Sequence, residues 1–274
     1  MSVKMKTNRM DVLTVTICLT FLPVMISASG RNGRERTRRM VCLANLQQLT
    51  SAWNIYADDN DDRIVNGAPL GTSGMAMPGT GLHKNEIPWV GRCYHDNYPV
   101  GEQLSEQTQT NAIMDGAMWP YLHELRIYRC PNGFKGEMLN YAAMDGINGL
   151  PRAGTTANPH IFLKKRADIT GSLALRMVYI DEGWATPSSF AVHYTTEAWW
   201  DDPPMRHSDG TTLSFVDGHT EYHQWQGVET IQFGRQQVQT HTSTCPCNTD
   251  EGKMDLHYIQ KGCWGKLGYT PENL

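Results

Sequence analysis

The first sixty residues constrain the fold of this chain most. The segment Val12–Ser29 contains no charged side chain, and a cluster of arginines follows it directly. As a helix this segment is about 27 Å long, which is enough to cross the hydrocarbon core of a bilayer. The sequence therefore predicts a single-pass membrane anchor near residues 10–30.

The same segment has a second interpretation. Lys4, Lys6 and Arg9 give a basic start, and Ser27-Ala28-Ser29 offers small residues of the kind that signal peptidases cut. Cleavage near Ser29 would release a secreted or surface module that binds a carbohydrate or a metal. The N-terminus of the mature protein distinguishes the two interpretations.

Residues 38–57 are predicted to form an amphipathic helix. Apolar residues recur there at steps of four, three, four and three, which makes one stripe on a helix. We call this stripe the seam: Cys42, Leu46, Leu49, Trp53 and Tyr56. It is suited to packing on this protein's own sheet or on neighbouring helices. The acidic run 58–62 then ends the helix.

The remainder of the chain favours short strands and long loops. It is rich in glycine and proline, with 25 and 14 in the whole sequence. We predict an α+β fold of two parts, an anchor and amphipathic helix over 1–60 and a head over 61–274. Within the head we expect a long loop over 66–88, a short helix near Ala112–Leu122, strands at Leu139–Ala143, Leu173–Ile180 and Ser189–Tyr194, and a tail from Gln236 without clear periodicity.

A β-hairpin is the best-defined local element. Two strand-like runs, Thr211–Val216 and His219–Trp225, flank Asp217-Gly218, a pair typical of a two-residue type I′ turn. That turn would place Phe215 opposite Thr220 and Leu213 opposite Tyr222.

Seven cysteines leave several pairings open. Cys18 and Cys42 lie in apolar sequence, where a thiol acts as a small hydrophobic group. If the head is exported, disulfides are allowed, and the candidates are Cys93–Cys130 and Cys263 with Cys245 or Cys247. Zinc competes, although the single residue between Cys245 and Cys247 is shorter than the usual spacing of zinc ligands.

Four patches of sequence resemble one family. The run from Arg206 to His219 has a histidine, nine residues and then Asp-Gly, at His207, Asp217 and Gly218. It is similar to the prepilin-processing-associated proteins named for that spacing. Three further patches agree in order: Cys42–Leu49 with Tyr56–Asp61, then Tyr128-Arg129-Cys130-Pro131, then Tyr179-Ile180-Asp181-Glu182.

This resemblance implies a type IV pilin-like or type II secretion pseudopilin-like subunit, which is structural rather than catalytic. It implies a long N-terminal helix, membrane-spanning and then amphipathic, packed on an antiparallel sheet. The expected location is the cell inner membrane, with the head periplasmic or extracellular, and the expected partners are the membrane and other pilin-like subunits or secretion machinery.

The processing site departs from the family's pattern. Counting back from Cys42 makes Thr7 the first mature residue and Asp11 the acidic one. Lys6 then stands where the family has glycine. We therefore do not expect prepilin peptidase to cleave this chain, and the segment serves as an uncleaved anchor.

Sequence patterns of common active sites are absent: there is no nucleophile elbow, phosphate-binding loop or dinucleotide fingerprint. The net charge of −4 does not favour nucleic acid. His207 and Asp217 should lie roughly 30 Å apart along an extended strand. We therefore interpret Asp217-Gly218 as turn residues and His207 as a hydrogen-bonding group at the start of the strand.

Two weaker site hypotheses remain. A metal-dependent hydrolase would need His207, Asp217, His219 and Glu221 to converge in a pocket. No cofactor is otherwise expected, except calcium on oxygen ligands, for which the candidates are Asp181, Glu182, Asp201 and Asp202.

Overall fold

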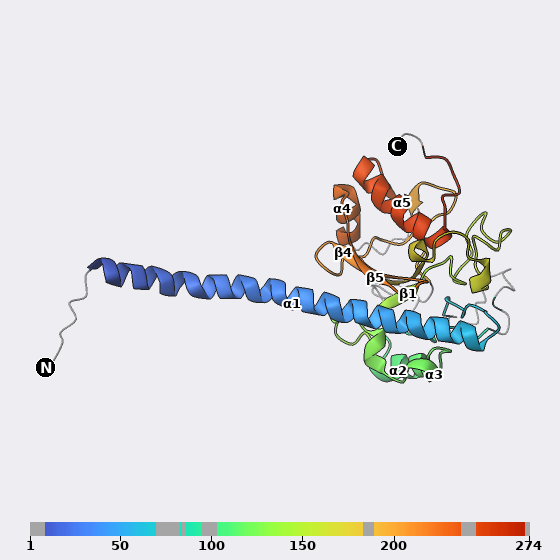
Figure 1. The fold of residues 1–274 in the computed structure, drawn as a ribbon, viewed down its shortest axis with the longest axis horizontal. Coiled ribbons are helices and arrows are strands. Elements are labelled where there is room, and N and C mark those ends of the chain that lie inside the picture. The colour runs from blue at the N-terminus through green and yellow to red at the C-terminus, as the bar shows by residue number, and fades with distance from the viewer. Residues whose placement is uncertain are drawn as a thin grey trace.

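The chain folds into an α+β body from which one long helix extends (Figure 1). The computed structural model describes residues 9–69, 83, 86–94, 103–182, 189–236 and 245–271, with side chains from residue 30 onward except at positions 31, 245 and 246. Thr7, the side chain of Asp11 and the side chains of Val12–Ser29 lie outside the described residues, as does most of the loop 66–88. Among the residues that the structure describes, no helix has an apolar stretch of membrane-spanning length.

Helix α1 (Arg9–Asp59) is continuous over 51 residues. Figure 1 shows its N-terminal part projecting away from the body and its C-terminal part lying against it. Cys42, Leu46, Leu49 and Trp53 are at most 1% exposed and belong to the main hydrophobic core, and Tyr56 packs beside them. The predicted seam is therefore confirmed, and it packs on this protein's own sheet.

The end of α1 follows from its acidic terminus. Asp61 and Asp62 adopt positive φ angles of 54° and 65°, a left-handed conformation that aspartate tolerates better than most residues. The N–H group of Asp62 donates to the carbonyl of Ala57 at 2.9 Å, which satisfies one of the last helical carbonyls.

An antiparallel sheet of four strands forms the centre of the body, in the order β1-β2-β4-β5. The strands are β1 (Tyr141–Ala143), β2 (Met177–Asp181), β4 (Gly210–Phe215) and β5 (Thr220–Gln224). All residues of β2 and β4 are buried, because α1 covers one side and α5 (Asp250–Trp264) contacts β2 from the other. Strand β5 is only half-buried, as an edge strand should be.

The β4–β5 hairpin differs from our prediction by one residue. Leu213 pairs with Glu221 and Ser214 with Thr220, and the N–H of Phe215 donates to the carbonyl of His219. The connection is thus three residues long. Gly218, with φ at +92°, supplies the left-handed residue that such a loop needs. Val216 belongs to the turn rather than the strand, and this moves the whole register.

Three other sequence predictions need correction. The single helix near Ala112–Leu122 is two helices, α2 (Glu106–Met114) and α3 (Trp119–Leu122), with Pro120 in the first turn of α3, where proline is tolerated. Leu173–Ile180 begins as a 3₁₀ helix, η3 (Leu173–Leu175), before β2. Ser189–Tyr194 forms only isolated bridges through Phe190 and Val192.

The C-terminal region is more ordered than its sequence suggests. It contains α4 (Val228–Gln236), the short strand β6 (Cys245–Pro246), which pairs with β3 (Ala198–Trp199), and α5. Two 3₁₀ helices, η1 (Leu125–Tyr128) and η2 (Arg166–Asp168), complete the elements.

Candidate functional site

Four side chains capable of binding a metal converge where α1 crosses the sheet. Cys42 comes from α1, Cys130 from the loop after η1, Asp181 from the end of β2 and His207 from the segment before β4. One potential ligand atom from each lies within 4.8 Å of all the others. All four residues have a relative exposure of 0%. We call this group the Cys2AspHis cluster.

Local structure explains why these side chains meet. The seam turns Cys42 toward the sheet, and β2 ends at Asp181, which pairs with Tyr141 of β1. The backbone of His207 folds back on itself, because its N–H donates to the carbonyl of Gly210 while the two residues between them have positive φ angles. That tight turn points the imidazole inward rather than along β4.

The ligand atoms already contact one another. Cys42 Sγ lies 3.2 Å from Asp181 Oδ2, and Cys130 Sγ lies 3.4 Å from His207 Nε2. His207 Nε2 is also 3.4 Å from Asp181 Oδ2. Two sulfurs, one imidazole nitrogen and one carboxylate oxygen therefore surround a single point in the interior.

The cluster shifts the pKa values of its members in opposite directions. Burial raises the pKa of Cys42 well above its usual range. A hydrogen bond with the Cys42 thiol lowers the pKa of Cys130, against the effect of its own burial. Burial alone would lower the pKa of His207, but hydrogen bonds with Asp181 and Cys130 raise it to about 10.

A second layer of polar groups holds the ligands. His207 Nδ1 lies 2.9 Å from Glu35 Oε1, and the hydroxyl group of Tyr141 donates to Cys42 Sγ at 3.2 Å. Thr212 Oγ1 is 2.9 Å from the same sulfur. The N–H group of Asn132 donates to Cys130 Sγ at 3.4 Å. Each of these groups fixes the direction of a side chain that would bind a metal.

Catalysis by these groups meets a physical obstacle. Cys130, His207 and Glu35 follow the order of a nucleophile, a base and an orienting carboxylate. Cys130 and His207 are however 0% exposed, so a substrate cannot approach the sulfur. The buried arrangement suits a bound ion better than a reacting molecule.

The hydrolase hypothesis required a different set of residues to converge, and the structure separates them. Asp217 and His219 pair with each other in the hairpin turn, with Asp217 Oδ1 2.6 Å from His219 Nδ1. Glu221 accepts a hydrogen bond from Tyr258 of α5. His207 alone of that set belongs to the cluster.

The calcium candidates do not form one site either. Asp181 lies among sulfur and nitrogen ligands, which calcium does not prefer. Asp201 accepts a hydrogen bond from the N–H of Ala191 at 2.6 Å, and burial raises its pKa to about 7. Among the described residues, the structure brings three or more His, Cys, Asp or Glu side chains close enough to share an ion in the Cys2AspHis cluster. Glu182, Asp201 and Asp202 do not belong to it.

The disulfide predictions are wrong for this structure. Cys93, Cys130 and Cys263 are buried free thiols, so neither Cys93–Cys130 nor a pair involving Cys263 is formed. Cys93 Sγ instead faces backbone carbonyl groups. The side chain of Cys245 lies outside the described residues.

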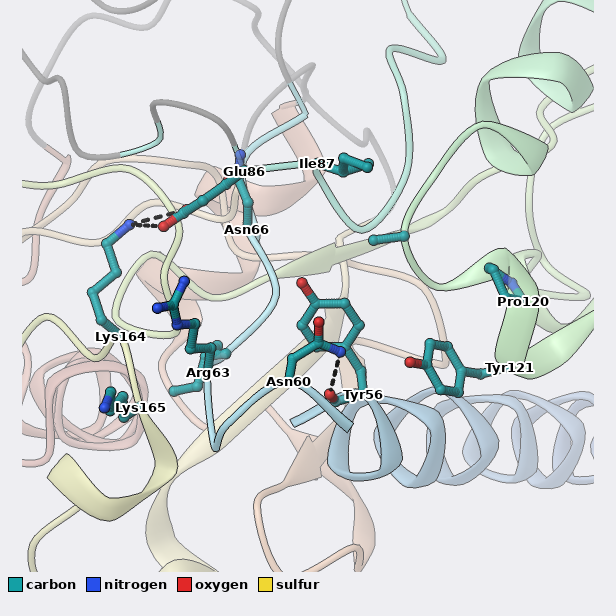
Figure 2. A pocket seen from close by; sticks show the side chains of 12 residues that line it. Tyr56, Asn60, Arg63, Asn66, Glu86, Ile87, Pro120, Tyr121, Lys164 and Lys165 are labelled. Atoms are coloured by element: carbon teal, nitrogen blue, oxygen red, sulfur yellow. Dashed lines mark hydrogen bonds and ion pairs between the residues drawn. The ribbon is translucent and has the colours of Figure 1, made fainter. Parts of the chain in front are cut away.

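A separate cleft of about 780 Å³ lies at the C-terminal end of α1 (Figure 2). Tyr56 approaches it from α1 and Asn60 from the turn that follows α1, and Tyr121 faces them from α3. On the other side Lys164 Nζ lies 2.9 Å from Glu86 Oε1. The lining mixes aromatic rings with charged groups, but no set of ligand atoms converges there as closely as in the cluster.

Comparisons of this chain with protein-family models, with curated proteins and with solved structures found no match. The resemblance noted in the sequence therefore stays a prediction.

Sequence reasoning named all four residues of the cluster but assigned them to different roles. Cys42 was expected in the seam, Cys130 in a disulfide, Asp181 in a calcium site and His207 in a strand cap. One signal could have joined them, because each of the four patches that resemble the family contributes one member of the cluster.

Proposed function

We propose that this chain is a non-catalytic, membrane-anchored structural subunit of the pilin-like or pseudopilin-like kind. It would serve a type II secretion or type IV pilus-like assembly, with the segment Val12–Ser29 in the inner membrane and residues 61–274 forming a head outside the cytoplasm. The observation that carries the proposal is the arrangement of α1. A single helix contains the uncharged segment in the part that extends from the body and the buried seam in the part that packs on the sheet.

Assembly would proceed through lateral packing of these helices. No charged residue occurs between Arg39 and Asp58, although one face of this stretch is exposed. Its side chains are apolar, small or amide-bearing, which allows close approach of another helix without burying a charge. This face consists of Met40, Val41, Ala44, Gln47, Gln48, Ser51 and Ile55.

The proposal is tested by fractionating cells that produce the native protein, extracting the membranes with alkaline carbonate and sequencing the N-terminus of the purified chain. We expect the full-length or nearly full-length chain in the carbonate-resistant membrane fraction. A Leu19→Arg variant should shift toward the soluble fraction, because an arginine at the centre of a spanning helix costs about 2.5–3.5 kcal/mol on insertion scales.

Val41→Arg is the matched control, since Val41 is 45% exposed on the same helix but lies beyond the uncharged segment. It should stay in the membrane fraction. A soluble wild-type protein that begins near residue 30 would overturn the proposal and favour a released binding module instead.

A further inference from the structure

We propose that the Cys2AspHis cluster is a structural zinc site that fastens α1 to the head. The four ligands are Cys42 Sγ, Cys130 Sγ, Asp181 Oδ2 and His207 Nε2. This inference goes beyond the proposed function and does not depend on it, because a zinc ion could hold the helix on the sheet whether or not the chain is anchored in a membrane.

Distances between the ligand atoms support tetrahedral coordination. With Zn–S bonds of about 2.3 Å and Zn–N or Zn–O bonds of about 2.0–2.2 Å, neighbouring ligand atoms lie about 3.3–3.8 Å apart. The three separations given above are 3.2, 3.4 and 3.4 Å. These three separations agree with those of a zinc site to within a few tenths of an ångström, and the other three pairs among the four ligand atoms lie within 4.8 Å.

The chemistry of the ligands selects the ion. Thiolates and imidazole favour zinc, copper(I) or iron over calcium and magnesium, which prefer oxygen. Four protein ligands with no exposed surface leave no open position for water or substrate, as is typical of structural rather than catalytic zinc.

Groups around the ligands match what a zinc site needs. Glu35 at His207 Nδ1 leaves Nε2 directed at the metal, which reproduces a carboxylate–histidine–zinc arrangement. The other carboxylate oxygen of Asp181, Oδ1, accepts no hydrogen bond from the described residues and lies 3.9 Å from Arg206 Nε. The guanidinium group offsets the net negative charge of a zinc ion bound by two thiolates and one carboxylate.

The position of the cluster indicates what the ion would do. Its ligands come from α1, from two loops and from the end of β2, so one ion connects four segments that are distant in the sequence. Among the described residues, two of these segments, α1 and β2, otherwise meet through side-chain packing. Zinc bound here would strengthen the junction between the long helix and the sheet.

The experiment measures zinc in the full-length chain, purified in detergent without chelators, by inductively coupled plasma mass spectrometry. We expect one zinc per chain. After exchange for cobalt(II), the intense visible bands of tetrahedral cobalt and a thiolate-to-cobalt charge-transfer band should appear. Removing the ion with a strong chelator should lower the Tm, and adding zinc should restore it.

Variants identify the ligands. Cys130→Ser should lose the zinc, whereas Cys93→Ser, which removes a buried thiol outside the cluster, should retain one zinc per chain. If Cys130→Ser does not fold, Cys130→His provides the test, because it keeps a zinc ligand and should weaken the thiolate-to-cobalt band while retaining the metal.

Three results would overturn the proposal. These are a folded wild-type chain that binds no zinc from micromolar solution, a disulfide between Cys42 and Cys130 found by mass spectrometry of the native protein, and binding of iron or copper in preference to zinc. Membrane localisation is measured separately, so failure of the zinc site and failure of the anchor are distinguishable.

Discussion

Truncating Leu49 tests whether the second half of α1 is part of the core of the head. Leu49 is 0% exposed, between the other buried residues of the seam. Replacing a buried leucine by alanine removes apolar contacts and leaves a cavity, at a cost of about 2–5 kcal/mol. Since 1 kcal/mol shifts the Tm of a domain this size by about 2–4 °C, we expect Leu49→Ala to lower the Tm by roughly 4–20 °C.

Ile55→Ala is the matched control on the same helix. Ile55 is 49% exposed, and its truncation should cost less than about 1 kcal/mol. Urea unfolding of both variants can be followed by tryptophan fluorescence, because Trp53 lies one turn from Leu49 and is buried in the same interface. Equal losses of stability in the two variants, or an unchanged Leu49→Ala protein, would refute the packing of the seam on the sheet.

Three further predictions concern the turn, α5 and a buried acid. Gly218→Ala should lower the free energy of unfolding by about 1 kcal/mol, because φ is +92° there; no neighbouring atom crowds the site, so the cost comes from the backbone alone. Gly33→Ala, in an exposed part of α1, is the control and should be neutral or stabilising. A neutral Gly218→Ala variant would contradict the turn geometry. Asp255→Ala should lower the free energy of unfolding by about 2–4 kcal/mol, because the Asp255 carboxylate accepts hydrogen bonds from two backbone N–H groups of the β5–α4 connection. Asp255→Asn keeps one acceptor oxygen and should lose less stability. Equal losses of the two variants in urea titrations would argue against those bonds. Asp201 has a pKa of about 7 in the folded chain and about 4 when unfolded, so between these values the folded state binds the extra proton. The stability of the wild type, relative to that of Asp201→Asn, should therefore fall by up to about 1.4 kcal/mol per pH unit as the pH rises from 4 to 7. Parallel stability–pH curves for the two proteins would exclude this.

The seam was predictable because helical periodicity is a local property. Steps of three and four residues mark the buried face of α1 before any partner is known, and a buried Leu46 or Trp53 follows directly. The antiparallel hairpin was predictable too, because the turn signal Asp217-Gly218 is also a local property of the sequence. Its register was not, because Val216 has strand-like chemistry but belongs to the turn, and one residue of slippage exchanges every cross-strand partner.

Helix α5 was missed although its boundaries carry the expected signals. Thr249 caps its first turn and Gly265 ends it in a left-handed conformation. The sequence of α5 shows no clear apolar periodicity, because polar residues such as Asp255 are buried along with the apolar ones. Gly262 lets α5 approach β2 closely, since the Met177 side chain occupies the space where a Cβ atom would lie.

The Cys2AspHis cluster could not be found from residue spacing, and only the shared origin of its members in the four family-like patches pointed to it. Cys42, Cys130, Asp181 and His207 are separated by tens of residues, so no spacing rule connects them. Only the arrangement of α1 against β2 and β4 brings them together. Each residue alone was compatible with a common structural role, and the chemistry appears only when the four are considered as one set.

The continuity of α1 has a mechanical consequence. A helix of 51 residues is about 77 Å long, and its hydrogen-bonded backbone makes it a stiff rod. A stiff helix would transmit a force applied at its N-terminal end to the sheet, and the stress would be concentrated at the first buried contacts, near Cys42. Those contacts would bear the strain first, so the resistance of this protein to pulling should be decided at that junction rather than in the strands.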